Sequence, residues 1–193
     1  MISFVPGYYG WLGNQMFQYA AVKAHSLRMN TDCAFPQNKP NLHSVFNLTA
    51  SKSSANLKRY IEPSFTHTPL PKEKDLMLDG YFQSEKYFSD FEDTIRDEFI
   101  FIDTIDPPET EMVSIHVRRG DYLRLPNHHP VCNMNYYRQA MGEFPKKHFL
   151  VFSDDKAWCK QNFTGSNIAV SEGNTPAQDM QLMSLCDHHI IAN

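Results

Sequence analysis

The residue types best suited to chemistry lie together in one short stretch, His116-Val117-Arg118-Arg119-Gly120-Asp121. An apolar run precedes it, which is typical of a buried strand that delivers polar groups at its carboxyl end, where open α/β sheets bind ligands. Two adjacent guanidiniums are planar, permanently charged donors that suit phosphate oxygens. The alternative is a structural ion-pair cluster between the arginines and Asp121, and the residue types alone favour neither interpretation.

A second apolar run, Phe149 to Phe152, ends in Ser153-Asp154-Asp155. In a parallel sheet this hydroxyl and these carboxylates lie on the same edge as Arg118. They could bind a metal ion, but no D-x-D pattern occurs in the chain. They are at least as well suited to accept hydrogen bonds from a purine or a sugar hydroxyl. The alternative is that Asp154 or Asp155 only caps the following helix.

A loop with three glycines in seven residues, Gly7 to Gly13, precedes an expected helix. Glycines at this density permit close approach of the backbone to a ligand. The spacing G-x-x-G-x-x-G differs from the dinucleotide fingerprint G-x-G-x-x-G, and no acidic residue follows where a ribose would need it, so a dinucleotide site is disfavoured. For Asn14, which follows the loop, the alternative to a ligand contact is a plain helix cap.

The first half of the chain has an uneven pattern. Its periodicity predicts strands at 1–5 and 76–83 and helices at 15–29 and 84–99. Ser84 is the expected cap of the last helix. Residues 31–71 are rich in Asn, Ser, Pro and Lys, which predicts irregular structure with one or two short helices. Pro107-Pro108 then marks the expected boundary, because consecutive prolines break regular structure.

Beyond the prolines, strands and helices alternate regularly. Strands are expected at 113–117, 148–152, 168–170 and 189–192, and helices at 135–144, 156–162 and 177–185. This alternation predicts right-handed βαβ units in a parallel sheet. The expected fold class is therefore α/β, with a doubly wound second half.

Composition limits the classes of function. The 193 residues carry a net charge of -4 with a pI near 6.1, which argues against a nucleic-acid-binding surface. The four cysteines form no C-x-x-C pair, so reduced thiols are expected rather than a zinc site. No basic-apolar leader opens the chain, and no apolar run approaches the roughly 20 residues of a membrane span. A cytoplasmic protein without a transmembrane segment is expected.

Five blocks of residues resemble the α-1,2-fucosyltransferase family of glycosyltransferases in order and spacing. The blocks are Leu12 to Ala20, Gly80 to Phe88, His116 to Tyr122, Phe152 to Asp155 with Trp158, and Asp179-Met180 with Met183-Ser184 and Ile190 to Asn193. Together they extend over nearly the whole chain. The H-x-R-R-x-D block is shared more widely, with α-1,6- and protein O-fucosyltransferases.

The resemblance implies a GT-B-like fold of two Rossmann-type lobes. Residues 1–106 would form the acceptor-side lobe, and residues 109–193 the lobe that binds GDP-fucose. Such families transfer L-fucose from GDP-fucose to a galactoside hydroxyl in α-1,2 linkage, with inversion and without a metal ion. The expected partners are therefore GDP-fucose, as the donor substrate, and an acceptor glycan, and no cofactor is expected.

The resemblance also implies roles for single residues. In the family, the first arginine of the block bonds the β-phosphate of GDP, so Arg118 is expected to stabilise the charge that grows on the diphosphate as the C1–O bond breaks. Arg119 should point elsewhere if the backbone stays extended, and is expected to support the lobe or to pair with Asp121. By analogy with the protein O-fucosyltransferases, Asn14 is expected to reach the donor and the acceptor.

His116 and Asp121 are the two candidates for a general base. The alternative is attack on an almost free fucosyl cation with late loss of the proton. His116 and Asp154 are also expected to line the nucleotide pocket. Further substrate contacts are expected from Gly13, Gln15, Arg119, Ser153 and Asp179, and no residue is expected to ligate a metal.

Two features depart from the family pattern. Trp11 stands where relatives have Arg or Gly before Leu-Gly-Asn-Gln, a difference that bears on acceptor contacts. The family continues beyond Ile-Ile-Ala-Asn with a serine-rich segment, whereas this chain ends at Asn193, so an incomplete donor lobe is expected. The competing functions are a fucosyltransferase, a truncated relative that binds a GDP-sugar or glycan without turnover, and a structural α/β domain.

Overall fold

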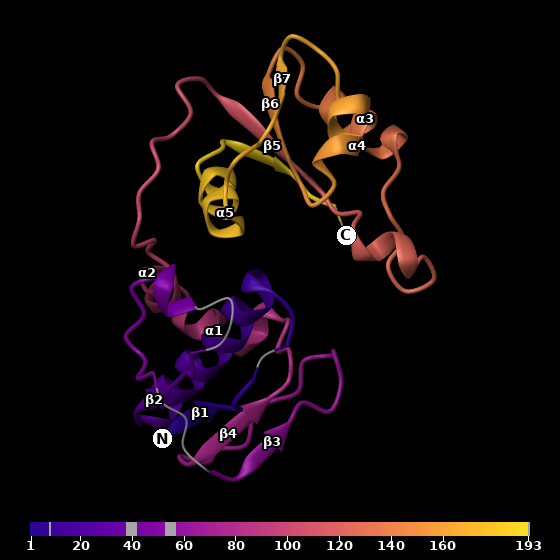
Figure 1. Cartoon of the computed structure of the whole chain (residues 1–193). Helices are drawn as coiled ribbons and strands as arrows, with labels where there is room; N and C mark the ends of the chain where they lie inside the picture. Colours follow the sequence, from indigo (N-terminus) through magenta and orange to yellow (C-terminus); the bar gives the residue numbers. More distant parts are fainter. Residues whose placement is uncertain (8, 38–41, 53–56, 193) are drawn as a thin grey trace. The chain divides into compact units, whose positions relative to one another are not determined.

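The structure is a computed structural model that describes residues 1–7, 9–37, 42–52 and 57–192. The chain divides into two compact units, unit 1 (Met1–Thr104) and unit 2 (Ile105–Asn193). Figure 1 shows that each unit has its own sheet and helices. The division falls just before Pro107-Pro108, the boundary expected from the sequence.

The described residues of unit 1 form a four-stranded parallel sheet with the order β2-β1-β4-β3. Its strands are β1 (Ile2–Phe4), β2 (Cys33–Ala34), β3 (Arg59–Ile61) and β4 (Leu76–Asp79). The central strands β1 and β4 are largely buried, and Ile2 pairs with Leu76. Because the strands are parallel, the loops that leave their carboxyl ends lie at one edge of the sheet.

Helix α1 (Leu12–Met29) packs against β1 and buries one apolar face, as its spacing predicts. It begins before the expected start at residue 15, so Asn14 lies within its first turn. The interpretation of Asn14 as a helix cap is therefore wrong. Trp11 holds the cap position and makes no side-chain capping bond. The helix ends at Asn30, whose φ of 48° is a left-handed conformation that Asn tolerates.

Residues 84–99 do not form the single helix that their pattern predicts. The observed elements are the 3-10 helices η2 (Glu85–Tyr87) and η3 (Ser89–Phe91) and the helix α2 (Glu92–Glu98). Phe88 breaks the helical path with φ -141° and ψ 0°, and Ser84 makes no side-chain capping bond. The cause is tertiary, because Tyr87 is buried and its hydroxyl accepts the N–H of Thr68.

The segment 31–71 contains more regular structure than its composition indicates. Its described residues contain one short helix, the 3-10 helix η1 (Leu42–Ser44), and the strands β2 and β3, which the pattern did not predict. These two strands are short and lie within a polar, proline-containing segment, so the apolar pattern around them is too weak to be recognised. They are defined by backbone pairing with neighbours, as where Arg59 pairs with Met77 of β4.

The described residues of unit 2 form a second four-stranded parallel sheet, with the order β7-β6-β5-β8. Its strands are β5 (Met112–Val117), β6 (His148–Ser153), β7 (Ile168–Val170) and β8 (His188–Ile190). Numbered from β5, this is the order 3-2-1-4 that begins a Rossmann sheet. The direction of connection reverses between β5 and β8, and α/β sheets bind ligands at the carboxyl ends beside such a switch point. The predicted parallel, doubly wound second half is confirmed.

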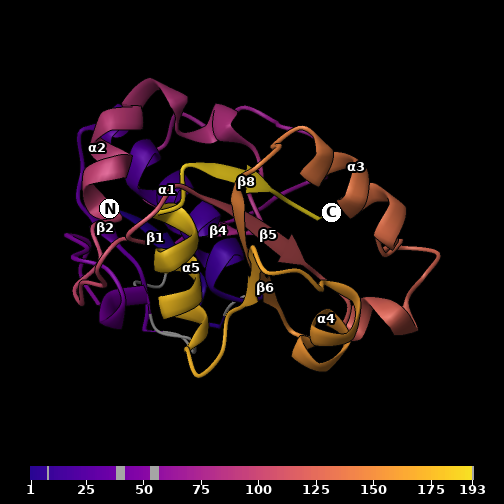
Figure 2. The same ribbon diagram turned by 90° about the horizontal axis from the view of Figure 1, so that it is seen from above.

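The helices of unit 2 are α3 (Met134–Gly142), α4 (Lys156–Asn162) and α5 (Pro176–Ser184), with the 3-10 helix η4 (Asp121–Arg124) after β5. Helices α3 and α4 lie on one side of β5 and β6, and α5 lies on the other side (Figure 1, Figure 2). Alternate residues of β5, from Val113 to Val117, pack against Tyr137 of α3 in a buried core. By strand alternation, Ser114 and His116 face the side of α5.

The helices expected at 135–144, 156–162 and 177–185 correspond to α3, α4 and α5, and their ends agree closely. None of the four cysteines forms a disulfide, as expected. None of the helices in the described part of the chain has both the length and the hydropathy needed to cross a membrane.

Candidate functional site

Arg118 stands at the carboxyl end of β5, beside the switch point of the unit 2 sheet. Its Nη2 lies 2.6 Å from Asp121 Oδ1, and its Nη1 lies 2.8 Å from Asp154 Oδ2. The guanidinium carbon is 5.1 Å from the centre of the Tyr122 ring. The Arg118 side chain remains 27% exposed, and that of Asp121 is 56% exposed. The cation is thus held by its neighbours and is still open to an incoming anion.

Arg119 points in a different direction from Arg118, as an extended backbone predicts. Its Nε lies 3.1 Å from Asp155 Oδ2, and its guanidinium carbon lies 3.9 Å from the centre of the Trp158 ring. The predicted pairing of Arg119 with Asp121 is wrong. The 3-10 helix η4 turns the chain back, and Asp121 meets Arg118 instead, three residues away. Arg119 therefore ties the end of β5 to α4, a structural role.

Asp154 contacts both arginines. One carboxylate oxygen pairs with Arg118, and the other accepts the backbone N–H of Arg119 at 3.0 Å. A Cβ atom at Gly120 would lie 2.4 Å from Asp154 Oδ2, closer than real Cβ contacts allow. The glycine of the R-R-G-D stretch therefore leaves the space that the Asp154 carboxylate occupies beside the arginines.

Ser153 and Asp155 serve local structure. The Asp155 carboxylate accepts the N–H of Trp158 at 3.1 Å and so caps α4. Ser153 Oγ accepts the N–H of Asp155 at 2.9 Å. The hydrogen bond from Arg119, and then that from the Trp158 N–H, hold the pKa of Asp155 below its ordinary value. The helix-cap alternative is confirmed for Asp155, whereas Asp154 faces the arginines.

His116 lies close to this cluster in β5. Burial first, and then the positive charge of Arg118, lower the pKa of its imidazole, while the charge of Asp154 acts in the opposite direction. The ring is therefore neutral at neutral pH. Within the described part of the chain no side chain hydrogen-bonds to this ring, so its nitrogens are available to accept a proton.

Asp179 lies in the first turn of α5, near the carboxyl end of β7. Its Oδ1 accepts hydrogen bonds from Ser171 Oγ at 2.6 Å and Asn174 Nδ2 at 3.2 Å. Its Oδ2 lies 3.8 Å from Lys156 Nζ. Thr175 caps the same helix through a reciprocal bond with its third residue. These contacts give Asp179 a local structural role, and its expected contact with substrate stays a prediction.

The candidate residues of unit 1 lie at the start of α1. Gly13 is exposed, and Asn14 accepts a hydrogen bond from Gln83 Nε2. Gln15 is fully buried, and its side-chain N and O atoms have no hydrogen-bond partner among the described residues. A Cβ at Gly10, where φ is 72°, would lie 1.7 Å from Asn14 Nδ2, so this glycine makes room for Asn14. Gln15 is therefore out of reach of a substrate, unlike Gly13 and Asn14.

The family blocks of the sequence include Tyr122 and Trp158, but no role was predicted for either ring. Tyr122 lies beneath Arg118 and stacks on His129, with ring centroids 4.3 Å apart and an angle of 14° between the rings. Trp158 supports Arg119. Tyr122 directly follows the R-R-G-D stretch, so its position is visible in the sequence, whereas its contact with Arg118 is not. His129 gave no signal, because only the loop after η4 returns it to the site.

The carboxylates of this site are engaged by arginines. Asp121 and Asp154 pair with Arg118, and Asp155 pairs with Arg119. Among the residues that the structure describes, no three His, Cys, Asp or Glu side chains gather in a way that could hold a metal ion. Metal independence of the reaction stays a prediction.

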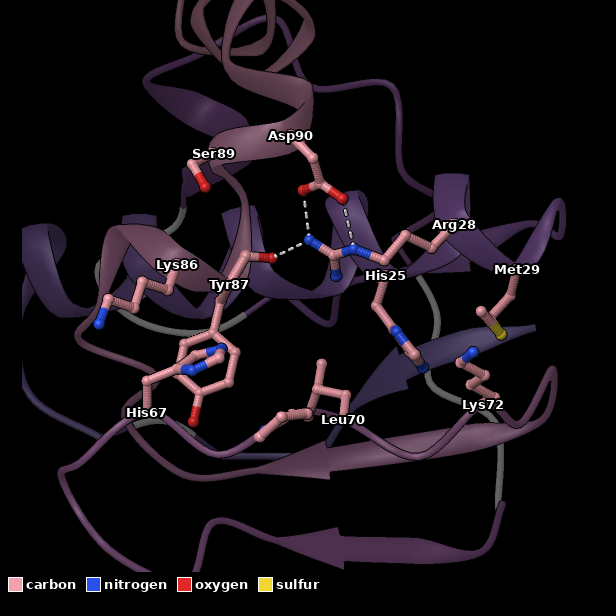
Figure 3. Close-up of a pocket in the computed structure, with 11 residues that line it drawn as sticks. His25, Arg28, Met29, His67, Leu70, Lys72, Lys86, Tyr87, Ser89 and Asp90 are labelled. Carbon is pink, nitrogen blue, oxygen red and sulfur yellow. Dashed lines mark hydrogen bonds and ion pairs between the residues drawn. The ribbon is translucent and has the colours of Figure 1, made fainter.

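Unit 1 has a cavity of about 390 Å³ at the far end of α1 from Asn14 (Figure 3). On its rim, Arg28 bonds the carboxylate of Asp90 and the carbonyl of Tyr87. His25, in its wall, is buried, and this burial is the main reason that the pKa of its ring is lowered. None of the candidate residues lines this cavity, and we assign it no role.

Each unit is thus an α/β unit with a parallel sheet, and the second has Rossmann strand order with an arginine at its switch point, as the expected GT-B-like fold requires. Comparison with known proteins agrees with this. The family described as "Glycosyl transferase family 11" matches residues 7–193, and the chain belongs to that family.

The chain is similar to curated members of known specificity. It is 30% identical to the alpha-1,2-colitosyltransferase of Escherichia coli, over 95% of this chain and 81% of that protein. It is 31% identical to galactoside alpha-(1,2)-fucosyltransferase 1 of Bos taurus, over 94% of this chain and 61% of that protein. The two alignments run over 236 and 226 residues, more than the 193 of this chain, so these relatives carry insertions within the matched region.

Among solved structures, the chain is similar to NodZ alpha-1,6-fucosyltransferase, whose crystal was soaked with GDP-fucose. The TM-score is 0.58, over 98% of this chain and 87% of that chain, with 12% sequence identity. At this identity the likeness concerns the fold alone. The expected GT-B-like fold is confirmed.

Proposed function

We propose that this protein transfers L-fucose from GDP-fucose to a galactoside hydroxyl, in α-1,2 linkage, with inversion and without a metal ion. Family membership supports glycosyl transfer, and the names of the relatives support the linkage. The observation that carries the proposal is the position of Arg118. A partly exposed guanidinium, fixed at the carboxyl edge of a Rossmann-type sheet beside its switch point, is suited to the diphosphate of a nucleotide sugar.

In this proposal Arg118 binds the leaving group. As the bond between C1 of fucose and the phosphate oxygen breaks, negative charge accumulates on GDP. A fixed cation stabilises that charge more in the transition state than in the ground state. Of the two carboxylates on Arg118, Asp121 is the more exposed, so the diphosphate displaces it first. Asp154 then keeps the arginine in position.

We assign proton transfer to His116. The acceptor oxygen bonds to C1 while the bond from C1 to the phosphate breaks, and the hydroxyl proton passes to the neutral imidazole. The lowered pKa of His116 and the absence of a hydrogen bond to its ring from any described residue support this role. Asp121 is the other candidate, and its carboxylate is already engaged by Arg118 in an ion pair.

The remaining candidates are assigned as follows. His116 and Asp154 are proposed to line the nucleotide pocket, and Gly13 and Asn14 are proposed to contact the substrates. Ser153, Arg119 and Asp179 act on the donor indirectly, because their polar groups are already bonded to neighbouring protein groups. Their substitution should change the shape of the donor site more than its direct bonds.

Incubation with GDP-fucose and lactose tests the proposal. We expect GDP release that depends on lactose, and a product whose α-1,2 linkage is visible by NMR, with and without a chelator. Heat stabilisation by GDP without any product would instead identify a relative that binds a GDP-sugar without turnover. If GDP does not stabilise the protein and no product forms, the remaining interpretation is a structural α/β domain.

A second donor deserves a direct comparison, because the relative from Escherichia coli is named a colitosyltransferase and is matched over most of its length. Colitose is fucose without the 3-hydroxyl group. The ratio of kcat/KM for GDP-fucose and GDP-colitose decides between the two donors. A site that hydrogen-bonds the 3-hydroxyl strongly disfavours the donor that lacks it, because polar groups are left unpaired.

A further inference from the structure

We propose that an aromatic ladder of three rings, Tyr9, Tyr81 and Phe65, is the surface on which the acceptor sugar stacks. The proposal rests on the proposed function and deepens it by naming the acceptor contact. The three rings come from loops that follow β1, β4 and β3. These strands are parallel neighbours, so the ladder lies at the carboxyl edge of the unit 1 sheet, where α/β sheets bind ligands.

The three rings contact one another in a row, and the outermost ring is exposed to solvent. The centroids of Tyr9 and Tyr81 are 5.2 Å apart, and those of Tyr81 and Phe65 are 5.7 Å apart. Phe65 is 73% exposed. A row of aromatic rings that runs from a fixed inner end to an exposed outer end presents apolar surface that a ligand can cover.

The inner ring is held from behind by a buried carboxylate. The Tyr9 hydroxyl donates to Asp79 Oδ1 at 2.6 Å, and Asp79 is buried at the end of β4. Arg59, on β3, forms an ion pair with the same carboxylate. The hydrogen bond to Asp79 is the first cause, and burial the second, of a raised pKa for Tyr9, so this hydroxyl stays protonated.

The middle ring is fixed through its backbone. Glu62 accepts the N–H groups of Tyr81 at 2.7 Å and Phe82 at 2.9 Å. A Cβ at Gly80 would lie 2.4 Å from Glu62 Cβ, so only glycine at this position lets the two loops meet. The inner and middle rings are therefore organised before any ligand binds, which lowers the entropy cost of binding.

Polar groups accompany the ladder. A cavity of about 380 Å³ at the same edge is lined by Tyr9 and Arg59, together with Val5, Pro6, Gly7 and Met77. This volume is within the range of about 300–1,000 Å³ found for small-molecule sites. One face of galactose carries mainly C–H groups, which suit the negative face of an aromatic ring, and the hydroxyls at its edge suit a guanidinium. The site therefore fits a galactoside.

Titration of methyl β-galactoside into the protein, followed by NMR, tests the contact without turnover. We expect saturation transfer from aromatic protons to the sugar C–H groups in the wild type, and its loss in Phe65→Ala. Phe65→Trp should restore it. Ile100→Ala, which removes another exposed apolar side chain of unit 1, is the matched control and should bind like the wild type.

Kinetics give the second measurement. In Phe65→Ala the acceptor KM should rise about three- to tenfold, the range expected for one aromatic contact. The KM for GDP-fucose and the slow hydrolysis of GDP-fucose without acceptor should stay unchanged. An acceptor KM within twofold of the wild type, in a variant with unchanged thermal stability, contradicts the ladder proposal.

The two proposals fail in different ways. If the protein shows no transfer but binds the galactoside through Phe65, the ladder stands and the proposed function falls. If it transfers fucose with an unchanged acceptor KM in Phe65→Ala, the function stands and the ladder falls. Because a purine can also stack on aromatic rings, GDP is titrated in parallel. Loss of GDP binding in Phe65→Ala would assign the ladder to the donor and overturn the proposal.

Discussion

Arg118 Nη2 and Asp121 Oδ1 lie 2.6 Å apart, three residues from each other along the chain, at the carboxyl edge of the unit 2 sheet. The pair neutralises the cation that the proposed reaction needs. The Asp121→Asn substitution removes the carboxylate that competes with the diphosphate for Arg118. GDP should therefore bind about two- to fivefold more tightly, which corresponds to the free energy of a partly exposed ion pair. If His116 is the base, kcat should stay within a few-fold of the wild type.

Calorimetry with GDP and steady-state kinetics measure the two effects of Asp121→Asn separately. A fall in kcat on the order of 10²–10⁴, with GDP affinity unchanged, would make Asp121 the general base and contradict the assignment to His116.

The two neighbouring arginines should differ in their effect on GDP binding. Arg118→Ala should weaken GDP binding about 10- to 100-fold, because charged hydrogen bonds to the diphosphate are lost, in addition to any stability lost with its ion pairs to Asp121 and Asp154. Arg119→Ala loses both its ion pair and its contact with Trp158, and should lower the free energy of unfolding by about 1–3 kcal/mol. GDP affinity of the folded Arg119 variant should stay close to that of the wild type.

Arg124→Ala, an exposed arginine at the end of η4, is the control for loss of charge alone. Chemical denaturation measures the stability of the three variants, and titration with GDP measures their affinity for the nucleotide. If Arg118→Ala and Arg119→Ala lose stability and GDP affinity to the same extent, both arginines have only a structural role, and the proposed phosphate contact of Arg118 is contradicted.

The pH dependence of transfer should report His116. Because the pKa of His116 is lowered in the folded protein, its imidazole stays neutral down to a pH below the ordinary histidine value of about 6.5. Activity should therefore fall only as the pH drops below that value, as protonation removes the acceptor of the proton. His116→Gln should lose on the order of 10²-fold or more in kcat, and should also lose this acid limb.

The control for His116 is His128→Gln, which changes an exposed histidine of the same unit and should leave the profile unchanged. If the pH profile of His116→Gln keeps the acid limb of the wild type, a group other than His116 causes that limb.

Glu98 should dominate the acid stability of unit 1. It is only 4% exposed, pairs with Lys23 at 2.7 Å, and accepts bonds from the Tyr19 hydroxyl and the Thr49 N–H. Burial alone would raise the pKa of Glu98, but these hydrogen bonds outweigh it and hold the pKa below its ordinary value. Its contribution is therefore complete above the unfolded pKa of about 4.3, and is lost as the pH falls through the lower folded value.

Glu98→Gln should destabilise the protein by about 2–4 kcal/mol at pH 7, because it leaves Lys23 unpaired in a largely buried site. Glu92→Gln breaks an exposed pair with Arg96 and should cost about 0.5 kcal/mol or less. Urea unfolding at pH 7 and pH 3 measures both variants, because the loss lies below the unfolded pKa of about 4.3. A destabilisation by Glu98→Gln that does not shrink toward acid pH would contradict the linkage.

The order of elements in unit 2 followed from the sequence alone. The longer elements there, such as β5, β6 and α4, carry a period that can be read locally, and the carboxyl-end positions of Arg118 and Asp154 follow from that order. The pattern failed where tertiary contacts override it. Phe88 interrupts the helix predicted after Ser84 because Tyr87 is anchored in the core, and β3 exists only through pairing with β4.

What the sequence determined by itself was the alternation of strands and helices and the residue types delivered to the sheet edges, because both depend on neighbours along the chain. Only the tertiary structure decided which partners those residues meet. Asp121 meets Arg118 because η4 turns the chain back. Tyr9, Phe65 and Tyr81 form one ladder because β1, β3 and β4, far apart in sequence, join in one sheet. No local period records such pairings, because they depend on how the chain returns to itself.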